Sequence, residues 1–414
     1  MNDEITNIPK IRFKGYTEDW EQRKLGELAE SFEYGLNASA KKFDGRNKYI
    51  RITDIDDISN TFNQSGVTSP DIDFTNADNY KLKKGDILFA RTGASVGKTY
   101  MYRESDGLVY YAGFLIRARI KSKISSEFIF QTTFTDSYNQ FIKITSQRSG
   151  QPGINAEEYS NFKIMIPNYE EQNSIGRFFK KIDDTIALHQ RELDLLRKTK
   201  QTYLQKMFPK AGEDRPEIRF AGFTEPWEQR KLKEITERVR GNDGRMDLPT
   251  LTISAGSGWL DQRERFSGNI AGKEQKNYTL LKKGQLSYNH GNSKLAKYGA
   301  VFELKTYNEA LVPRVYHSFG TNELSNPNFI EYMFATKRPD KELAKLVSSG
   351  ARMDGLLNIN FDEFMGINVS IPSVGEQKKI GSFFEQLDDT IALHQRNLNV
   401  LKEMKKSLLQ QMFV

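Results

Sequence analysis

The sequence predicts an α+β protein built from two mixed α/β domains and two long helices, arranged as an internal repeat. Three observations lead to this expectation. The chain has 414 residues, which is enough for two or three domains. Its two halves begin and end with nearly identical segments. Each half also closes on a long stretch with a heptad pattern of apolar residues, which is typical of a coiled-coil helix.

Composition narrows the class of protein. Hydrophobic residues make up 37% of the chain, which supplies real cores and argues against a disordered protein. The net charge of +7 fits an acidic partner such as nucleic acid without establishing one. The lack of cysteine excludes disulfide scaffolds, cysteine-ligated zinc and thiol nucleophiles. The sequence shows no apolar run of membrane-span length and no secretory signal, so we expect a cytoplasmic protein without a membrane partner.

The two repeats match at their ends. Residues 11–25 return at 218–232 with twelve of fifteen positions identical, and Asp183–Arg191 recurs unchanged as Asp388–Arg396. The interiors between these ends have diverged almost completely. Uniform drift after a gene duplication would not leave nine identical residues beside such interiors. We therefore expect a shared mechanical frame that carries two different specificities.

These matches divide the chain into four segments. The first is an N-terminal segment with a variable domain, and the third is a linker with the other variable domain. The second and the fourth are the repeated helices. The predicted boundaries are 1–168, 169–208, 209–372 and 373–414. Because residues 1–16 resemble the linker 209–223, we expect the N-terminus to lie near the end of the second helix, so that the chain almost closes a ring.

Each variable domain is predicted to be a mixed α/β globule with a sheet. In the first interior, we expect strands over 49–55, 86–91 and 110–120 and a helix over about 126–138. In the second interior, we expect strands over 248–254, 285–289, 300–304 and 314–319 and a helix over 326–336.

The two repeated helices share an apolar seam. A helix of about 35 residues, roughly 50 Å long, cannot bury its stripe against a small domain, so the two stripes are expected to bury each other. The predicted seam residues are Ile175, Phe179, Ile182, Ile186, His189, Leu193 and Leu196 in the first helix, and Ile380, Phe384, Leu387, Ile391, His394, Leu398 and Leu401 in the second.

Polar residues interrupt the seam at the same places in both helices. Lys200 and Lys405 occupy heptad position a, and His189 and His394 occupy position d. Polar seam residues lower stability but fix register and partner number. A metal pair or a proton switch is the functional alternative for the histidines, and we expect a structural role and no bound metal. The paired aspartates that begin at Asp183 and Asp388 are expected to be solvated or docking charges rather than acid–base catalysts.

Residues 85–99 resemble a strand that runs into a phosphate-binding loop. That loop needs four residues between its glycines, so that backbone N–H groups can wrap a phosphate, and Gly93 and Gly97 are separated by three. The residues that follow are expected to form a strand rather than a helix. The sequence therefore argues against nucleotide binding, and a loop that carries Arg91, Thr92, Ser95 and Lys98 suits DNA better.

Two further motifs fail as catalytic signatures. Asn326-Pro327-Asn328-Phe329 lacks the second proline of the adenine methyltransferase motif, and an Asn cap followed by Pro at the first helical position explains it better. Ser126 is expected to take the equivalent place in the first repeat. Glu303-Leu304-Lys305 resembles half of a nuclease site but has no acidic partner at the usual spacing. We therefore expect no catalytic residues in this chain.

The predicted DNA-contacting residues are basic or amide-bearing side chains in the loops of the variable domains. In the first domain they are Lys83, Lys84, Arg91, Thr92, Ser95, Lys98, Arg148 and Gln151. In the second domain they are Lys282, Lys283, Asn289, His290, Asn292, Lys294, Lys297 and Arg352. Each of them alone could be an ordinary solvated side chain, and only the set on matched loops favours DNA.

The order of variable domain, long helix, variable domain and matching helix resembles the specificity subunit of type I restriction–modification systems. The Trp-Glu-Gln-Arg-Lys-Leu segments at Trp20 and Trp227 carry the resemblance, together with the Ile-Pro, Glu-Gln and Asp-Asp-Thr-Ile-Ala-Leu-His-Gln-Arg segments that surround each long helix. The resemblance covers essentially the whole chain, and the variable domains add little to it.

The resemblance implies that each variable domain is a target recognition domain that reads one half of a bipartite, asymmetric site in double-stranded DNA. It implies that the two helices pack antiparallel and set the spacer between the half-sites. It also implies a subunit with no catalytic site and no cofactor of its own, bound to two methyltransferase subunits that carry S-adenosylmethionine. Motor–nuclease subunits that use ATP and Mg²⁺ would complete the restriction enzyme.

Two other classes of protein remain open from the sequence. A pseudo-symmetric scaffold would carry other proteins on the coiled coil without reading DNA. A self-contained enzyme would need a cofactor site, which the sequence does not show.

Overall fold

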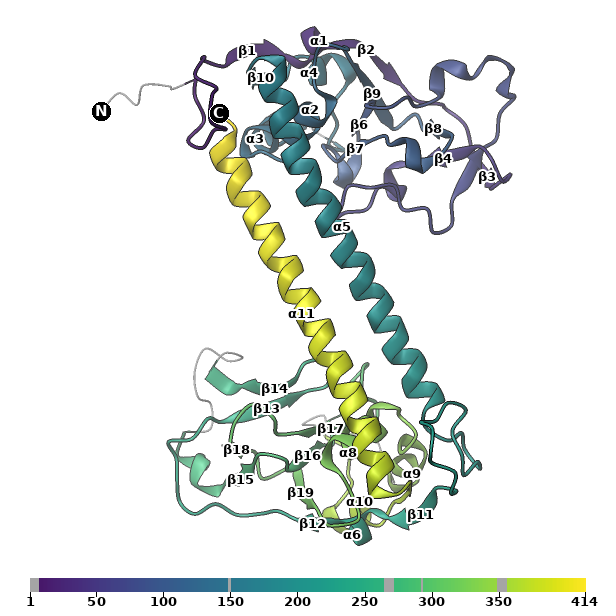
Figure 1. Ribbon diagram of the computed structural model, residues 1–414, viewed down its shortest axis with the longest axis vertical. Coiled ribbons are helices and arrows are strands. Elements are labelled where there is room, and N and C mark those ends of the chain that lie inside the picture. Colours follow the sequence, from purple (N-terminus) through teal and green to yellow (C-terminus); the bar gives the residue numbers. More distant parts are fainter. Residues whose placement is uncertain (1–6, 148–149, 264–271, 292, 348–355) are drawn as a thin grey trace. The chain divides into compact units, whose positions relative to one another are not determined.

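The computed structural model describes residues 7–147, 150–263, 272–291, 293–347 and 356–414. The chain divides into two compact units (Figure 1). Unit 1 comprises residues 1–192 and 394–414, and unit 2 comprises residues 193–393. Each long helix contributes to both units: α5 is Tyr169–Lys206 and α11 is Val374–Met412. Both helices lie inside the segments predicted for them.

The same four-stranded antiparallel sheet forms the centre of each unit. In unit 1 its order is β2-β9-β6-β7, and in unit 2 it is β12-β19-β16-β17. The strands of unit 1 are β2 (Ala29–Tyr34), β9 (Leu115–Ile120), β6 (Ile87–Ala90) and β7 (Thr99–Met101). Those of unit 2 are β12 (Thr236–Arg238), β19 (His317–Thr321), β16 (Leu286–Asn289) and β17 (Ala300–Glu303). The predicted α+β fold with an internal repeat is confirmed.

Short antiparallel pairs tie the beginning of each repeat to the start of its long helix. They join β1 (Glu21–Lys24) to β10 (Lys163–Ile166) and β11 (Glu228–Lys231) to β20 (Asn368–Ile371). Two short helices, α1 (Leu25–Leu28) and α6 (Leu232–Ile235), follow the first strand of each pair. The remaining helices are α2 (Ser126–Thr132), α3 (Asp136–Thr145) and α4 (Ala156–Ser160) in unit 1, and α8 (Pro327–Ala335), α9 (Asp340–Leu346) and α10 (Phe361–Met365) in unit 2.

The interiors differ in the sheet that accompanies the central one. Unit 1 has a second four-stranded sheet, in the order β3-β5-β4-β8, in which β4 and β8 are parallel. Its strands are β3 (Ala40–Lys42), β5 (Thr68–Pro70), β4 (Lys48–Ile50) and β8 (Val109–Tyr111). Unit 2 has two antiparallel pairs instead, β13 (Leu251–Ser254) with β14 (Gly258–Asp261) and β15 (Thr279–Lys282) with β18 (Glu309–Val312).

The structure shortens some predicted elements of unit 1. The expected strand over 110–120 is two strands, β8 and β9, because the chain turns at residues 112–114 between them. The expected helix over about 126–138 is interrupted after α2, where Thr135 caps the new helix α3. Of the strand expected over 49–55, only the part up to Ile50 is strand, and a single helical turn follows at Ile52–Asp54. In unit 2, β16, β17 and α8 match their predictions, whereas β13 begins three residues later than predicted and β19 is shifted from 314–319 to His317–Thr321.

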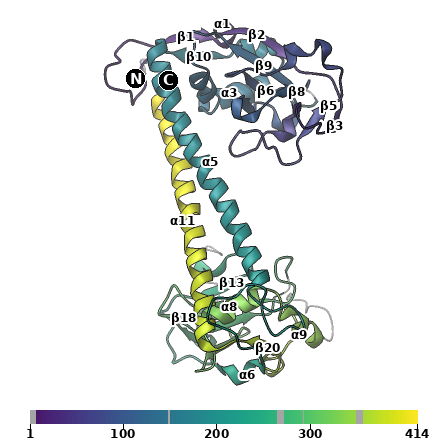
Figure 2. The ribbon, with the colours of Figure 1, turned by 45° about the vertical axis from the view of Figure 1, so that its right-hand side comes forward.

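The long helices pack antiparallel in each unit, and both ribbon views show them side by side (Figures 1 and 2). In unit 1, Asp183 meets Lys405 and His189 meets His394. In unit 2, Lys200 meets Asp388 and Tyr203 meets Phe383. Residue numbers rise along α5 as they fall along α11, which defines the antiparallel direction.

An arginine clamp holds the entry segment to the long helix in each repeat. Arg12 donates two hydrogen bonds of 2.7 Å to Glu171, and Arg219 donates bonds of 2.8 and 2.7 Å to Glu376. Both glutamates are buried, and bidentate charge-assisted bonds of this kind compensate for the lost hydration. In unit 1 the backbone N–H of Ile11 also donates to the carbonyl of Gln411, 2.9 Å away, so residue 11 lies beside the end of the second helix. The N-terminus itself lies outside the described residues.

A glycine in each long helix allows a close approach to a shorter helix. A Cβ on Gly176 would lie 2.9 Å from the backbone N of Phe128, and a Cβ on Gly381 would lie 2.8 Å from Cβ of Asn328. Any larger residue would therefore push α5 away from α2, and α11 away from α8.

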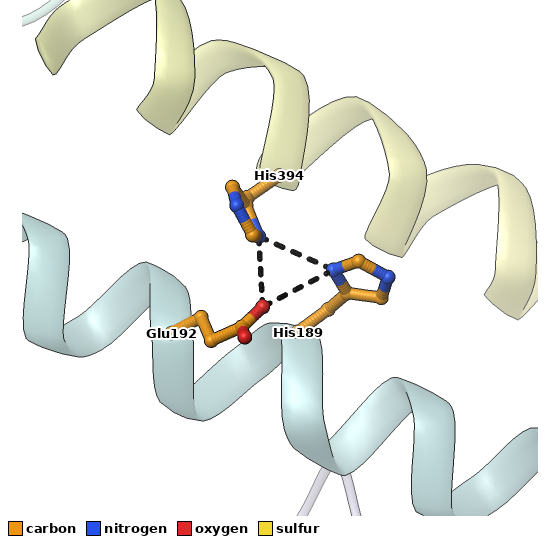
Figure 3. A group of neighbouring side chains, drawn as sticks. All are labelled: His189, Glu192 and His394. Atoms are coloured by element: carbon orange, nitrogen blue, oxygen red, sulfur yellow. Dashed lines mark hydrogen bonds and ion pairs between the residues drawn. The ribbon is translucent and has the colours of Figure 1, made fainter.

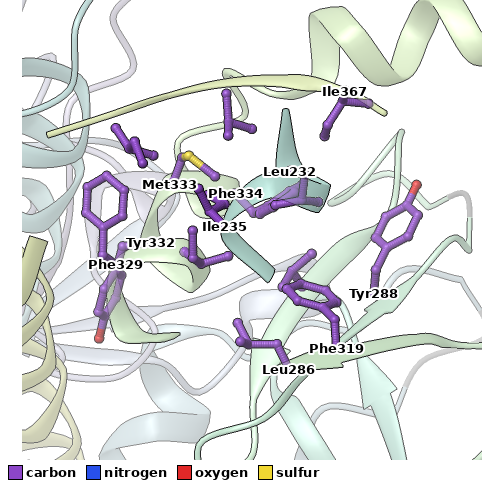
Figure 4. Close-up of a cluster of buried hydrophobic side chains, with 14 of the residues drawn as sticks. Leu232, Ile235, Leu286, Tyr288, Phe319, Phe329, Tyr332, Met333, Phe334 and Ile367 are labelled. Carbon is purple, nitrogen blue, oxygen red and sulfur yellow. The ribbon is translucent and has the colours of Figure 1, made fainter. Parts of the chain in front are cut away.

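Aromatic clusters complete the frame of each unit. In unit 1, Phe413 at the end of α11 packs on Trp20 and Phe128. In unit 2, Phe208 after the end of α5 packs on Trp227 and Phe329 in the same way. Figure 4 shows the surrounding core of unit 2, where apolar side chains from the central sheet, α6 and α8 meet. These duplicated contacts explain why the ends of the two repeats retain the same residues.

Candidate nucleic-acid interface

A groove of about 650 Å³ opens on unit 1 beside the central sheet. Its walls are the segment that follows β2, the turn after β4, the residue after β6 and the turn between β8 and β9. The lining residues that carry polar or aromatic side chains are Tyr34, Asn37, Tyr49, Arg51, Thr53, Arg91 and Phe114.

Two arginines and two exposed aromatic rings line this groove. The Arg91 guanidinium lies over the Tyr34 ring, with 4.9 Å between its central carbon and the ring centroid. Tyr34 is 43% exposed and Phe114 is 63% exposed, which is unusual for large rings. Arg51 is held by two hydrogen bonds of 2.9 and 2.8 Å to Asp54. Such a surface offers stacking faces, positive charge and hydrogen-bond donors together, which is the chemistry of nucleic-acid contact.

Arg91 was predicted from the sequence, whereas Tyr34, Arg51 and Phe114 were not. Each of the three lies at the end of a short strand or in a turn, and all three line the same groove as Arg91. Tyr34 is the last residue of β2, a strand that was not predicted from the sequence, so no sequence signal marked it.

The loop between β6 and β7 gathers several of the predicted DNA-contacting residues. Thr92 pairs with Gly153 in an isolated bridge, and the backbone N–H of Gly93 donates to Pro152. These contacts place Gln151 beside the loop that carries Arg91, Thr92 and Ser95. Because β6 and β7 form an antiparallel hairpin, the prediction that a strand rather than a helix follows this loop is confirmed.

The other predicted residues of unit 1 lie elsewhere. Lys98 forms an ion pair of 2.5 Å with Asp57 and is largely buried, so it fastens the loop rather than facing solvent. Lys83 and Lys84 are exposed but precede β6, at the opposite end of the strand from Arg91. Lys84 lies 3.9 Å from Glu104. Arg148 lies outside the described residues.

The loop after β16 is the counterpart in unit 2. Lys294 and Lys297 are exposed there, whereas Lys282 and Lys283 lie at the other end of β16. The amide nitrogen of Asn289 donates to the carbonyl of Ile253 over 3.2 Å. The remaining predicted residues divide into a buried one, His290, and two that lie outside the described residues, Asn292 and Arg352.

His290 packs inside unit 2 with a second histidine. Its Nδ1 lies 2.8 Å from the carbonyl of Leu357, and its ring lies 4.9 Å from that of His317. Burial lowers the pKa of His317 to about 4, so this imidazole stays neutral at physiological pH. Sequence reasoning placed His290 on the DNA surface, whereas the structure makes it part of the packing beneath the loop.

The Glu303-Leu304-Lys305 segment gains acidic neighbours that the sequence could not indicate. Lys305 lies 3.0 Å from Glu331 of α8 and 3.9 Å from both Glu303 and Glu385. Burial raises the pKa of Glu303 to about 7. An ammonium group among the carboxylates makes this an ion-pair cluster. Nearby, Asn326 caps α8 with Pro327 at its first turn, as predicted, while Ser125 rather than Ser126 caps α2.

Most of the predicted seam residues are buried. Those with less than a tenth of their surface exposed are Ile175, Phe179, Ile182, Ile186, Leu193, Ile380, Phe384 and Leu398. The remaining six are half-buried: His189, Leu196, Leu387, Ile391, His394 and Leu401.

The lysines of the seam each pair with an aspartate of the opposite helix. Lys405 lies 2.7 Å from Asp183 and Lys200 lies 2.5 Å from Asp388. Asp183 and Asp388 were expected to be solvated or docking charges, and the structure makes them interhelical partners instead. Their neighbours Asp184 and Asp389 remain exposed.

In the part of the chain that the structure describes, no helix combines the length and apolar character needed to cross a membrane.

Comparison with known proteins places the chain in a family. The profile of the type I restriction modification DNA specificity domain matches twice, at residues 17–198 and 224–403. The type I restriction enzyme MjaVIII specificity subunit of Methanocaldococcus jannaschii is 20% identical over 95% of this chain and 91% of its own length. The putative type I restriction enzyme MjaX specificity subunit of the same organism is 26% identical over 208 residues, and the match spans about half of each protein, 49%.

A solved structure has the same fold. The S subunit of the type I restriction-modification system from M. genitalium aligns over 98% of this chain and 99% of its own, with a TM-score of 0.65 and 14% identity. Since the double profile match covers most of the sequence, the chain belongs to the family of type I restriction–modification DNA specificity subunits.

Proposed function

We propose that this chain is the non-catalytic DNA-reading subunit of a type I restriction–modification complex. Each unit reads one half of a bipartite, asymmetric site in double-stranded DNA. The paired helices set the spacer between the half-sites and dock two methyltransferase subunits. Motor–nuclease subunits join them in the full complex. S-adenosylmethionine belongs to the methyltransferase subunits, and ATP and Mg²⁺ belong to the motor subunits.

The observation that carries this proposal is one frame built twice around unlike interiors. The central sheets share their strand order, the arginine clamps repeat, and the lysine–aspartate pairs repeat. Beside the sheet, however, unit 1 has a second four-stranded sheet where unit 2 has two separate pairs. Different loops on equal frames suit two readers of different base sequences.

In unit 1, the groove lined by Tyr34, Arg51, Arg91 and Phe114 supplies the reading chemistry. Lysine and arginine contacts to phosphates position the unit and make affinity dependent on salt. Hydrogen bonds to base edges then discriminate by about 1–3 kcal/mol for each bidentate contact. Tying two readers together makes the second binding event intramolecular, so the spacing becomes part of the specificity.

An exchange of interiors tests the proposal. Residues 33–160 would be replaced by the corresponding segment of a related specificity subunit, and methylated adenines would be mapped across the genome of a host that carries the methyltransferase subunits. We expect one half of the recognised sequence to change, while the other half and the spacer stay the same. An unchanged methylation pattern would support a scaffold that does not read DNA.

A further inference from the structure

We propose that His189, Glu192 and His394 form a binding site for one divalent transition-metal ion, with zinc as the reference ion, between the two long helices. All three residues belong to unit 1. Figure 3 shows their polar ends turned toward one another, with His189 and Glu192 on α5 and His394 on α11. This site is independent of the groove and of DNA reading.

The three ligand atoms form a nearly equilateral triangle. The Nδ1 atoms of His189 and His394 are 3.2 Å apart. Oε2 of Glu192 lies 3.7 Å from Nδ1 of His189 and 3.3 Å from Nδ1 of His394. Ligands about 2.0–2.1 Å from a tetrahedral metal lie about 3.3 Å from one another, so the triangle has the size of one face of such a tetrahedron.

The donor set matches the same class of metal. Two imidazole nitrogens and one carboxylate oxygen are ligands that zinc and its first-row neighbours accept, and they are poor ligands for magnesium or calcium. The three side chains are 23%, 44% and 21% exposed, so solvent reaches the cluster. A water molecule completes the fourth position.

Without a metal ion, the hydrogen-bonding groups of these three side chains are less well satisfied. Two facing Nδ1 atoms form a hydrogen bond only when one carries a proton and the other does not. The Glu192 carboxylate then competes for the same proton. A metal ion would instead accept a lone pair from each of the three groups and would join two helices at residues 205 positions apart in the sequence.

Sequence reasoning expected a structural role for the two histidines because it saw no carboxylate at ligand spacing. Glu192 stands three residues after His189, on the same face of the helix, and is the carboxylate that was overlooked. The position equivalent to Glu192 in the second repeat is Asn397. The pseudo-symmetric histidine pair therefore has a carboxylate on one side only, which predicts one ion per chain.

Zinc titration of the full-length chain, without an affinity tag and after removal of metals by chelation, tests the site. Competition with a chromophoric chelator measures zinc affinity and stoichiometry, and the visible spectrum of added cobalt reports tetrahedral coordination. The variants are Glu192→Asn, which copies the second repeat, and His394→Asn. Glu403→Asn is the matched control, because Glu403 is an exposed glutamate of α11. Circular dichroism confirms that each variant is folded.

We expect one zinc ion per wild-type chain and a tetrahedral cobalt spectrum. Because even outer-shell changes weaken metal sites by about tenfold or more, each ligand variant should lose at least that much affinity, and Glu403→Asn should lose none. His290 and His317 remain in every variant and control for non-specific imidazole binding. A wild-type chain that binds neither zinc nor cobalt would overturn the proposal. Equal binding by wild type, Glu192→Asn and His394→Asn would do the same.

Discussion

Arg91 combines two properties that a base-reading side chain needs. It is positioned by the end of β6 and by its contact with the Tyr34 ring, and its guanidinium faces a groove with exposed aromatic neighbours. Lys84 has a similar charge but lies at the other end of β6, next to Glu104. Position on the sheet, rather than charge, therefore distinguishes the two residues.

Substitution of Arg91 by alanine should weaken binding of the assembled methyltransferase to its own site about tenfold or more, since a good base contact is worth about 1–3 kcal/mol. The loss should be smaller on duplexes already altered in the half-site read by unit 1. Lys84→Ala is the control and should leave this selectivity unchanged. Equilibrium binding to a panel of duplexes measures both the loss of affinity and the selectivity for the half-site. A larger effect of Lys84→Ala would place the reading surface at the opposite end of the sheet.

Glu303 makes the folding stability of unit 2 depend on pH. Burial raises the pKa of this carboxyl to about 7 in the folded chain, above its ordinary value near 4.5. Between these two values the folded state binds more protons than the unfolded state. The contribution to stability is therefore fully present below pH 4.5 and is lost as the pH rises through 7.

The Glu303→Gln variant should abolish that dependence. Between pH 5 and pH 8 the wild type should lose about 2 kcal/mol of unfolding free energy relative to the variant. This expected loss is smaller than the full pKa shift would give, because solvent partly screens the charge. Urea denaturation at both pH values measures the difference. Glu237→Gln, at an exposed position of β12, should behave like the wild type. A Glu303→Gln chain that loses stability in parallel with the wild type would exclude this carboxyl as the cause.

The long helices owe their register to partly buried ion pairs as well as to apolar packing. Lys405 is 14% exposed and Asp183 is 20% exposed, and Gln131 of α2 donates a further hydrogen bond of 2.8 Å to Asp183. Burial lowers the pKa of Lys405. A shifted register would leave such charges without partners, which is costly in a partly buried position.

A double-mutant cycle on Asp183 and Lys405 measures this contribution. Each single alanine variant should lose about 3 kcal/mol of unfolding free energy, because it leaves the other charge buried and unpaired. The double variant should lose much less than the sum. The exposed pair Lys180 and Asp184 on α5 is the matched control, with an expected coupling of about 0.5 kcal/mol or less. Additive losses at Asp183 and Lys405 would contradict a role in fixing the register.

Periodicity allowed the seam to be predicted, because burial along a helix follows a fixed spacing that is visible in the sequence. Phe179 and Phe384, both placed at heptad position a, are fully buried. The partners of Lys200 and Lys405 could not be predicted in the same way. They lie on the opposite helix, and only the antiparallel packing brings them into contact.

The residues that line the groove were even harder to predict from the sequence than the partners of the seam lysines. Its residues come from four separate turns, and the sequence gives no spacing rule that links Tyr34, Arg51 and Phe114 to Arg91. Basic residues in loops could be identified from the sequence. The sequence does not indicate, however, at which end of a strand each of these residues lies. For this reason Lys83, Lys84 and Lys98 were grouped with Arg91, although the structure separates them from it or buries them.

At the scale of the whole molecule, the duplicated frame is the feature that the proposed function uses. Contacts at the ends of each repeat are built twice, from Arg12 and Glu171 in one unit and from Arg219 and Glu376 in the other. The family relationship and this frame support the proposal that each variable interior determines the half-site its unit reads. They also support the proposal that the helices set the spacing between the two half-sites. The spacing function makes a quantitative claim that the other predictions do not test.

Insertion of one heptad into each long helix, next to the contact between His189 and His394, tests that claim most directly. Seven residues keep the apolar seam in phase and lengthen each helix by about 10 Å, which corresponds to about three base pairs of B-DNA. Methylated adenines would then be mapped for the assembled complex. We expect the same two half-sites separated by a spacer about three base pairs longer, whereas an insertion of four residues, which breaks the heptads, should abolish assembly or shift the spacer irregularly. An active complex that keeps its original spacer after the heptad insertion would show that the helices do not set the spacing.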